Sequence, residues 1–240
     1  MVAQSSRASP GGCTARQARC ARPLFGVSLT LGRGEVAALM GRNGAGKSTT
    51  LKAIMGLLPP RGGSVRFAGT DIAGLPPFRI ARLGLGYVPE DRRIFTDLTV
   101  DENLDVGRRA AREGRTPWTP ERLFAIFPNL ADMRGRRAAA MSGGEQQMLT
   151  IARTLMGNPE AVLLDEPSEG LAPVIVEQMA EAVLRMKAEG IAVLLSEQSL
   201  DFAAAVADHA HVIERGVIRF QGSMAALEAD DAVREAYLTV

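Results

Sequence analysis

The sequence predicts an α/β fold with a mainly parallel sheet and a helical subdomain inserted into it. Residues 161–165 (AVLLD) and 191–195 (IAVLL) are short apolar runs, which is typical of parallel strands buried on both faces. A helical pattern over residues 173–188, closed by Gly190, separates them, as a crossover between parallel strands requires. From about residue 95 to residue 158 the pattern is helical only, so we expect the insertion there.

The remaining elements follow from local patterns. Further strands are expected at alternating or apolar runs, namely residues 27–31, 35–40, 64–67 and 85–88. A helix is expected over residues 47–57, ended by Pro59 and Pro60. Within the insertion, capping residues mark three helix starts: Thr99 with Glu102, Thr119, and Ser142 with Glu145. The C-terminal part predicts a hairpin of residues 211–214 and 217–221, followed by two short helices.

Composition excludes several classes of function. The 240 residues suit one large domain or two small ones, and a net charge of +1 argues against a nucleic-acid partner. No apolar run approaches the ~20 residues of a membrane-spanning helix, so a membrane role would act through a partner. Cys13 and Cys20 are expected to be free thiols in a reducing cytosol. His209 and His211 are expected to pack in a strand rather than to bind a metal.

The N-terminal part has an unusual composition. Its first 34 residues hold five arginines and no acidic residue, which resembles an organellar transit peptide. Pro10, Gly11 and Gly12 would break an amphipathic helix there, so a disordered or wrongly assigned start is preferred. We therefore expect a disordered tail over residues 1–22 and one domain over residues 23–240.

The segment GRNGAGKS, residues 41–48, matches the P-loop pattern G-x-x-x-x-G-K-[ST] and lies between a predicted buried strand and a helix. Its glycines let the backbone curl so that N–H groups point at phosphate oxygens. Lys47 would reach the β- and γ-phosphates, and Ser48 would bind Mg²⁺. A plain glycine-rich turn is the alternative. The predicted contacts to ATP are Gly41, Arg42, Asn43, Gly44, Ala45, Gly46, Lys47, Ser48 and Thr49.

Two acidic residues, Asp165 and Glu166, stand at the end of the apolar strand 161–165. Asp165 would reach the carboxyl edge of the sheet, where ligands bind in such folds, and would hold Mg²⁺ through water. Glu166 beside it would accept a proton from the attacking water, or orient that water. Alone, the two carboxylates could equally be a solvated acidic pair, but the P-loop upstream favours the catalytic interpretation.

The segment MSGGEQQML, residues 141–149, is named the serine–glycine motif below. Ser142 and Glu145 form a capping box, so a helix begins here with exposed backbone N–H groups at Gly143 and Gly144. Such a helix end binds anions. The motif carries no lysine, so it lacks the cation that completes the P-loop.

A P-loop, then S-G-G-E-Q, then a strand ending in D-E closely resembles the ATP-binding-cassette family of P-loop NTPases. In that family two subunits face head to tail and bury two ATP molecules between them. The resemblance implies that the serine–glycine motif contacts the γ-phosphate of ATP held by the opposite subunit, through Ser142, Gly143, Gly144 and Glu145. The motif then needs no lysine, because the opposite subunit supplies one.

Six motifs narrow the resemblance to the ATP-binding subunit of branched-chain amino acid importers. They are GRNGAGKST, GYVPEDRRIF, LTVDENL, MSGGEQQMLTIAR, DEPSEGLAP and LLSEQS, within residues 23–240. The resemblance implies hydrolysis of ATP with Mg²⁺, a second ATP-binding subunit in a homo- or heterodimer, two permease subunits and an extracytoplasmic substrate-binding protein. It also implies a peripheral position on the cytoplasmic face of the bacterial inner membrane.

Three alternatives stay open at this point. The same ATPase could serve a urea or short-amide importer, or the chain could be a regulatory nucleotide-binding subunit with weak turnover. The third is a soluble ATPase that remodels ribosomes or DNA. Such proteins usually carry two cassettes or a long coiled-coil insert, and this sequence has neither.

Four features depart from most relatives. Glu90 stands where a glutamine usually senses the γ-phosphate and Mg²⁺; a carboxylate cannot donate a hydrogen bond, so it would bind Mg²⁺ or a water. Gln198 stands where a histidine grips the γ-phosphate, and its amide can still donate one hydrogen bond. Ala172 replaces an aspartate that crosses the dimer interface. No aromatic residue precedes Phe25 and no first strand is recognisable, so adenine lacks an evident stacking partner.

Overall fold

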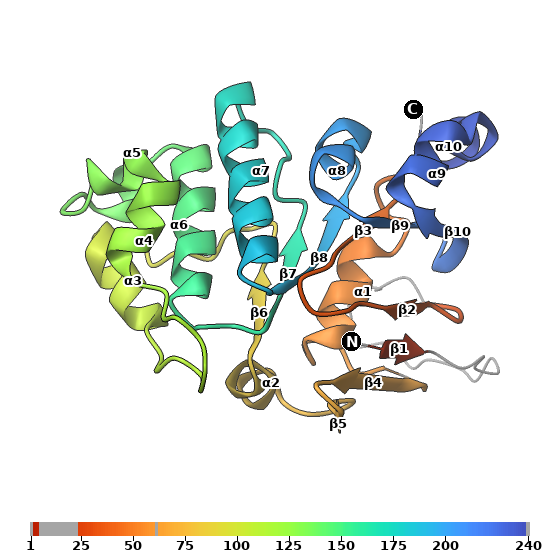
Figure 1. The fold of residues 1–240 in the computed structure, drawn as a ribbon, viewed down its shortest axis with the longest axis horizontal. Coiled ribbons are helices and arrows are strands. Elements are labelled where there is room, and N and C mark those ends of the chain that lie inside the picture. The colour runs from red at the N-terminus through yellow and green to blue at the C-terminus, as the bar shows by residue number, and fades with distance from the viewer. Residues whose placement is uncertain (1, 5–23, 61, 239–240) are drawn as a thin grey trace, which may run out of the picture.

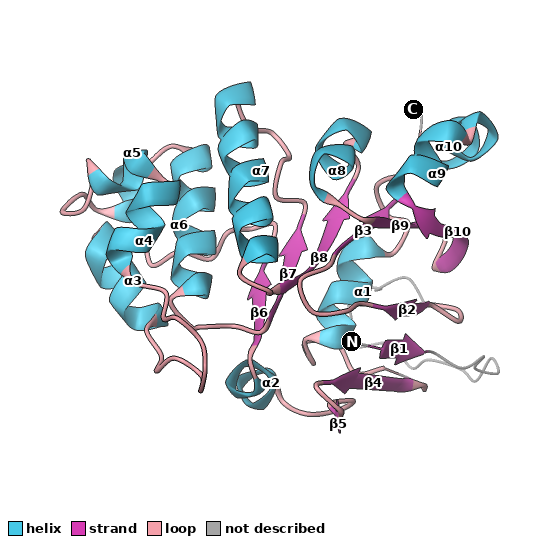
Figure 2. Cartoon of the chain, viewed as in Figure 1, coloured by secondary structure: helices cyan, strands magenta, loops and turns pink. Residues whose placement is uncertain are grey.

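The computed structural model describes residues 2–4, 24–60 and 62–238 of the chain. Helix α1 (Lys47–Ile54) lies between two sheets, and further helices cover the opposite face of the larger sheet (Figures 1 and 2). The larger sheet has six strands in the order β10-β9-β3-β8-β7-β6. The smaller sheet has four strands in the order β2-β1-β4-β5.

The larger sheet is parallel except at one edge. Its parallel strands are β3 (Val36–Met40), β6 (Leu85–Val88), β7 (Ala161–Asp165), β8 (Ala192–Glu197) and β9 (His209–Glu214). Strand β10 (Val217–Ser223) returns antiparallel to β9, as the predicted hairpin requires. Every residue of β3, β7 and β8 is buried, as expected for strands covered on both faces. The predicted mainly parallel α/β fold is confirmed.

Alternate residues of β3 face two separate cores. Val36, Ala38 and Met40 pack with the helices α6 (Gly143–Leu155), α7 (Pro173–Ala188) and α8 (Leu200–Val206), whereas Ala37 and Leu39 pack with α1 and the smaller sheet. This alternation is the two-residue period of a strand. It fixes β3 between two hydrophobic layers, so the loop that follows β3 leaves from a rigid position.

The smaller sheet corrects one expectation about the N-terminus. Strand β1 (Val2–Gln4) pairs antiparallel with both β2 (Ser28–Thr30) and β4 (Ser64–Phe67). The expected disordered tail over residues 1–22, without a first strand, is wrong for Val2–Gln4. The rest of the tail, with Cys13 and Cys20, lies outside the described residues. Strand β5 (Thr70–Asp71), which was not predicted either, pairs with β4.

The predicted insertion forms a helical subdomain between β6 and β7 (Figure 1). It consists of α3 (Val100–Gly107), α4 (Pro120–Ile126), α5 (Pro128–Ala131), a short 3₁₀ helix (Ala138–Ala140) and α6 (Gly143–Leu155). All three predicted N-caps are confirmed: Thr99, Thr119 and Ser142 accept backbone hydrogen bonds. Phe127, Leu104 and Leu123 are fully buried in its core.

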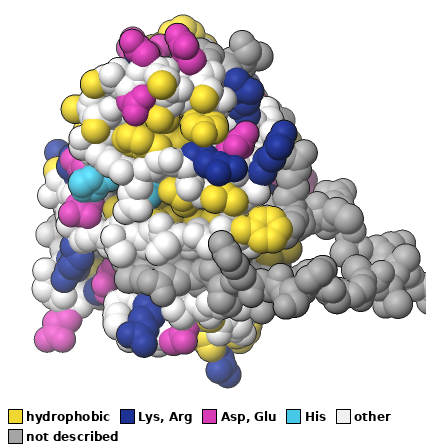
Figure 3. Space-filling model, turned by 90° about the vertical axis from the view of Figure 1, so that its right-hand side faces the viewer, with side chains coloured by type: hydrophobic (Ala, Val, Ile, Leu, Met, Phe, Trp, Pro, Cys, Tyr) yellow, Lys and Arg dark blue, Asp and Glu magenta, His cyan; other side chains and the backbone are white. Residues whose placement is uncertain are grey.

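The remaining three described helices are short and lie outside the helical subdomain. Helices α9 (Met224–Ala229) and α10 (Asp231–Tyr237) follow β10 as predicted, whereas α2 (Pro77–Leu83) was not predicted. On the face turned to the viewer in Figure 3, charged side chains of both signs are interspersed with hydrophobic ones. Among the residues that the structure describes, no helix combines the length and the hydrophobicity needed to cross a membrane.

Candidate functional site

The P-loop leaves the carboxyl end of β3 and leads directly into α1. Gly41 has a φ of 154°, and a Cβ atom there would lie 2.4 Å from the carbonyl oxygen of Ile213. Gly46 has a φ of 119° and serves as the N-cap of α1, with no side chain capping the helix. Among the described residues, no side chain caps the backbone N–H groups at the start of α1, as a phosphate-binding helix end requires.

Lys47 is buried in the first turn of α1 and reaches back over the loop. Its Nζ donates to the carbonyl oxygens of Gly41, at 2.6 Å, and Arg42, at 3.3 Å. It also forms an ion pair with Glu166 Oε1 at 3.1 Å. These contacts match the three donors of an ammonium group. The structure thus joins the P-loop lysine to the predicted catalytic carboxylate.

Asp165 ends β7 and is completely buried. Its Oδ1 accepts from Ser196 Oγ at 2.7 Å, and its Oδ2 accepts from the Tyr87 hydroxyl at 3.1 Å. Burial and the neighbouring Asp165 carboxylate raise the pKa of Tyr87 well above its usual range, so the tyrosine stays a neutral donor. Neither donor was predicted from the sequence. The feature that could have revealed them is that each is a polar residue on a strand next to β7.

Glu166 has a left-handed backbone conformation, with a φ of 48°. Its N–H donates to the carbonyl oxygen of Ser196 at 3.0 Å, which ties the turn after β7 to β8. Burial would raise the pKa of Glu166, but a hydrogen bond from Glu169, the charge of Lys47 and a hydrogen bond from Gln198 together hold it below its usual range. Glu166 is therefore an anion at neutral pH and able to accept a proton.

Gln198 follows β8 and bridges the P-loop and Glu166. Its Nε2 lies 2.9 Å from Asn43 Oδ1 and 2.9 Å from Glu166 Oε2. Neighbouring Glu197, which sequence reasoning missed, is buried and accepts the backbone N–H groups of Ser168 and Gln198, each at 3.1 Å. Its carboxylate therefore fastens the loop after β7 to the loop after β8. Burial raises the pKa of Glu197.

The serine–glycine motif has the predicted capping box. Ser142 Oγ accepts from the N–H of Glu145 at 3.3 Å, and Glu145 Oε2 accepts from the N–H of Ser142 at 2.6 Å. A Cβ atom on Gly143 would lie 2.6 Å from a guanidinium nitrogen of Arg92. One on Gly144 would lie 3.2 Å from Ile175. A side chain at position 143 would displace only the flexible end of Arg92, whereas one at position 144 would require Ile175 to shift by a few tenths of an ångström.

A cavity of about 180 Å³ lies behind Glu166. It is lined by Glu90, Arg92, Gln147, Glu166, Glu169 and Leu171. The structure therefore brings Glu90 to the same cavity as the predicted base. Glu169 and Gln147, which also line it, were not predicted as site residues.

The residues expected to hold Mg²⁺ are Ser48, Asp165 and Glu90. All three offer oxygen, which Mg²⁺ prefers, and this ion commonly takes only one or two carboxylates with phosphates and water completing its shell. In the described part of the chain, no group of three or more histidine, cysteine or acidic residues could hold a metal by itself. The donors thus fit an ion bound together with a nucleotide. His211 is buried in β9 and His209 is exposed.

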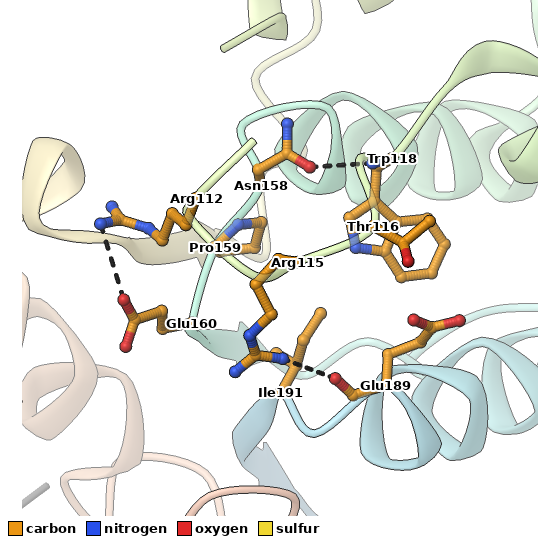
Figure 4. A pocket seen from close by; sticks show the side chains of 9 residues that line it. All are labelled: Arg112, Arg115, Thr116, Trp118, Asn158, Pro159, Glu160, Glu189 and Ile191. Atoms are coloured by element: carbon orange, nitrogen blue, oxygen red, sulfur yellow. Dashed lines mark hydrogen bonds and ion pairs between the residues drawn. The ribbon is translucent and has the colours of Figure 1, made fainter. Parts of the chain in front are cut away.

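A second hollow, of about 30 Å³, lies at the other ends of β7 and β8 (Figure 4). Arg115 Nη1 donates to the carbonyl oxygen of Glu189 at 2.6 Å, and Asn158 Oδ1 accepts from the N–H of Trp118 at 2.8 Å. Arg112 pairs with Glu160 at 3.6 Å. Because the space suits about one water molecule, these contacts anchor the loop of the helical subdomain to the core rather than bind a substrate.

Comparison with known proteins agrees with the site. Residues 24–169 match the family model described as ABC transporter. The chain is 43% identical to the high-affinity branched-chain amino acid transport ATP-binding protein BraG of Pseudomonas aeruginosa, over 90% of this chain and 92% of BraG. It is 34% identical to the lipopolysaccharide export system ATP-binding protein LptB of Haemophilus influenzae, over 88% of this chain and 89% of LptB.

A solved structure shows the same fold. The crystal structure of a nucleotide-free ATP-binding cassette from an ABC transporter matches with a TM-score of 0.74 and 31% identity, over 88% of this chain and 91% of that one. The family expected from the motifs is thereby confirmed. The chain belongs to the ABC transporter family, as one of its ATPase subunits.

Proposed function

We propose that this chain hydrolyses ATP to energise the import of branched-chain amino acids. The observation that carries the proposal is the network joining Lys47, Glu166, Gln198 and Asn43, which links the P-loop to a buried carboxylate. The similarity to BraG supports the choice of substrate, because that protein is named for branched-chain amino acid transport.

Nucleotide binding rearranges this network. The N–H groups of the P-loop bind the phosphates of ATP, and the Lys47 ammonium moves from Glu166 to the β- and γ-phosphates. Ser48, Asp165 and Glu90 would hold Mg²⁺, and the ion would neutralise phosphate charge. Glu166 loses its ion-pair partner and is free to accept a proton from the attacking water. Gln198 turns one of its two side-chain donors from Asn43 or Glu166 to the γ-phosphate or to that water.

The serine–glycine motif acts on the opposite subunit. Ser142, Gly143 and Gly144 present the start of α6 to the γ-phosphate of ATP bound by the other ATP-binding subunit. An anion at such a helix end gains about 0.3–1 kcal/mol when exposed and up to ~2 kcal/mol when partly buried. Closure of the dimer therefore depends on the γ-phosphate and reverses after hydrolysis. Glu145 contributes by holding the helix start in place.

The remaining partners follow from the same proposal. Two permease subunits receive the movement through the loop near Glu90 and the helical subdomain, and an extracytoplasmic protein delivers the substrate. The chain itself lies at the cytoplasmic face of the bacterial inner membrane, bound to the permease subunits.

Uptake by cells tests the substrate. Cells lacking this chain are complemented with the wild type or with Glu166→Gln, and uptake of radiolabelled leucine and urea is measured. We expect leucine uptake only with the wild type. If the wild-type chain restores urea uptake but not leucine uptake, the chain belongs to an amide importer. If cells lacking the chain take up both compounds normally but have an altered outer-membrane lipopolysaccharide, an exporter related to LptB is favoured. An active Glu166→Gln strain would indicate a regulatory subunit.

A further inference from the structure

Arg92 lies in the loop after β6, and its guanidinium group packs against the start of α6. An atom at the Cβ position of Gly143 would lie 2.6 Å from Arg92 Nη1, 3.1 Å from its Cζ and 3.2 Å from its Nη2. The Cα–Cβ bonds of a helix tilt toward its N-terminus. The guanidinium is therefore placed beside the end of α6 where the N–H groups of Gly143 and Gly144 have no acceptor among the described residues.

The positive charge of Arg92 has no counter-ion in the described part of the chain. Its guanidinium is half-buried and forms neither an ion pair nor a hydrogen bond with any described residue. This holds for the acidic residues that line the cavity of about 180 Å³ with it, namely Glu90, Glu166 and Glu169. The dipole of α6 also opposes a cation at the N-terminal end of the helix. An anion bound between the guanidinium and the free N–H groups would offset both costs.

The backbone holds Arg92 in place against a conformational cost. Arg92 and Arg93 have φ values of 61° and 47°, in the left-handed region that is unfavourable for residues other than glycine. Thr150 Oγ1, on α6, donates to the carbonyl oxygen of Arg92 at 2.8 Å. Arg153 Nη2, on the same helix, donates to the carbonyl oxygen of Arg93 at 2.5 Å. The loop is thus tied to α6, so Arg92 keeps its place beside the serine–glycine motif.

A second unpaired group lines the same cavity. Gln147, one turn along α6 from Gly143, is only 3% exposed, and its Oε1 has no hydrogen-bond partner among the described residues. Buried polar atoms are almost always hydrogen-bonded, and at about 30 Å³ per water molecule the cavity accommodates several waters. The unpaired cation and the unpaired acceptor therefore line one polar cavity, whose groups are completed by water or by a ligand.

We propose that Arg92 is a catalytic residue that acts on the opposite subunit. Its guanidinium and the N–H groups of Gly143 and Gly144 together hold the γ-phosphate of the ATP bound by that subunit. The inference rests on the proposed role of the serine–glycine motif. It adds a cation from the loop after β6 to a motif that carries no lysine of its own.

The chemistry of the guanidinium suits this role. Its planar donors match two phosphate oxygens at once, and it keeps its charge at any pH near neutrality. During hydrolysis, water forms its bond to the γ-phosphorus while the bond from that phosphorus to the oxygen of ADP breaks. Arg92 stabilises the charge on the γ-phosphate oxygens in this step, and it neither gives nor takes a proton. Because ADP lacks the γ-phosphate, the contact is made only with ATP.

The test places Arg92→Gln and Arg92→Lys in a Glu166→Gln background, in which the proposed base is removed and ATP persists. Arg93→Gln is the matched control: it removes the same charge from the next residue, which also has a positive φ and whose Nε pairs with Asp91 at 2.9 Å. Light scattering measures dimer formation against protein concentration with Mg-ATP. We expect Arg92→Gln to weaken the dimer by at least about 10-fold, the usual worth of a hydrogen bond to a charged group. Arg92→Lys should lose less, and Arg93→Gln should stay within about twofold of the background.

The affinity of each variant for a fluorescent ATP analogue is measured at protein concentrations too low for dimers. We expect it to stay within about twofold, which would also show that Arg92→Gln is folded. A dimer of Arg92→Gln as tight as that of Arg93→Gln would overturn the inference. A loss of ATP affinity in the monomer as large as the loss of dimer affinity would overturn it too, because Arg92 would then act on its own subunit's nucleotide. If the Glu166→Gln parent formed no dimer with ATP, the proposed role of the serine–glycine motif would fall, and this inference with it.

Discussion

Replacement of Lys47 by alanine should destabilise the nucleotide-free protein through the carboxylate that it leaves behind. The side chains of Lys47 and Glu166 are only 2% and 6% exposed, and their charged atoms lie 3.1 Å apart. Breaking a buried ion pair by removing one partner costs about 3–5 kcal/mol, because the remaining charge stays buried. Glu166 keeps the hydrogen bond from Gln198, so we expect a loss near the lower end, about 3 kcal/mol.

Urea unfolding at pH 7.5 of Lys47→Ala, Glu166→Gln and the double variant measures this loss. The double variant should be more stable than the sum of the single losses predicts by about 2 kcal/mol, within the range seen for contacting residues. Lys52→Ala, on the same helix but without an ion pair to any described residue, is the control and should lose less than about 1 kcal/mol. Additive losses, or a loss below about 1 kcal/mol for Lys47→Ala, would refute the buried pair.

Three further results are expected. Ser142→Asp keeps an N-cap for α6 but places a negative charge against the γ-phosphate. In a Glu166→Gln background, this substitution should therefore abolish the ATP-dependent dimer. Light scattering that still shows the dimer would contradict the proposed role of the serine–glycine motif. Because the pKa of Glu169 is raised, the folded state binds more protons than the unfolded state between pH 4.5 and about 7. The free energy of unfolding therefore falls as pH rises through that window. The melting temperature of Glu169→Gln should lack this fall, and parallel curves of melting temperature against pH for the variant and the wild type would exclude the shift. The chain lacks an aromatic residue before Phe25, and stacking of adenine on such a residue is worth about 1–3 kcal/mol. We therefore expect ATP to bind about one to two decades more weakly than with a stacking residue, and the protein to discriminate poorly between ATP, GTP and CTP. Competition assays on the wild type and on Ala21→Tyr test this, and a strong preference of the wild type for ATP would contradict it.

Elements that depend on local sequence were the ones that could be predicted. Strands β7 and β8 followed from apolar runs, and the starts of α3, α4 and α6 followed from Thr99, Thr119 and Ser142, because a cap is completed within three residues. Strand β1 could not be predicted, since three residues become a strand only by pairing with β2 and β4, which are distant in sequence. Helix α2 was missed because seven residues give too little periodicity.

The candidate site divides in the same way. The P-loop, Asp165, Glu166 and the serine–glycine motif have fixed spacings that the sequence displays. The contact between Asp165 and Ser196 depends on the register of β7 against β8, in which these residues are direct partners. The backbone hydrogen bond from Glu169 to Glu166 depends on the left-handed turn at Glu166. Neither the register nor the turn can be derived from composition or periodicity.

The central claim is that Glu166 activates water on ATP that Lys47 holds. The most direct measurement is phosphate release by the purified protein with Mg-ATP, for the wild type and Glu166→Gln, alongside ATP affinity for both. The account predicts similar affinities and a turnover lower by about 10²–10⁴-fold in Glu166→Gln. Equal turnover would contradict it, because the water would then be activated by another group.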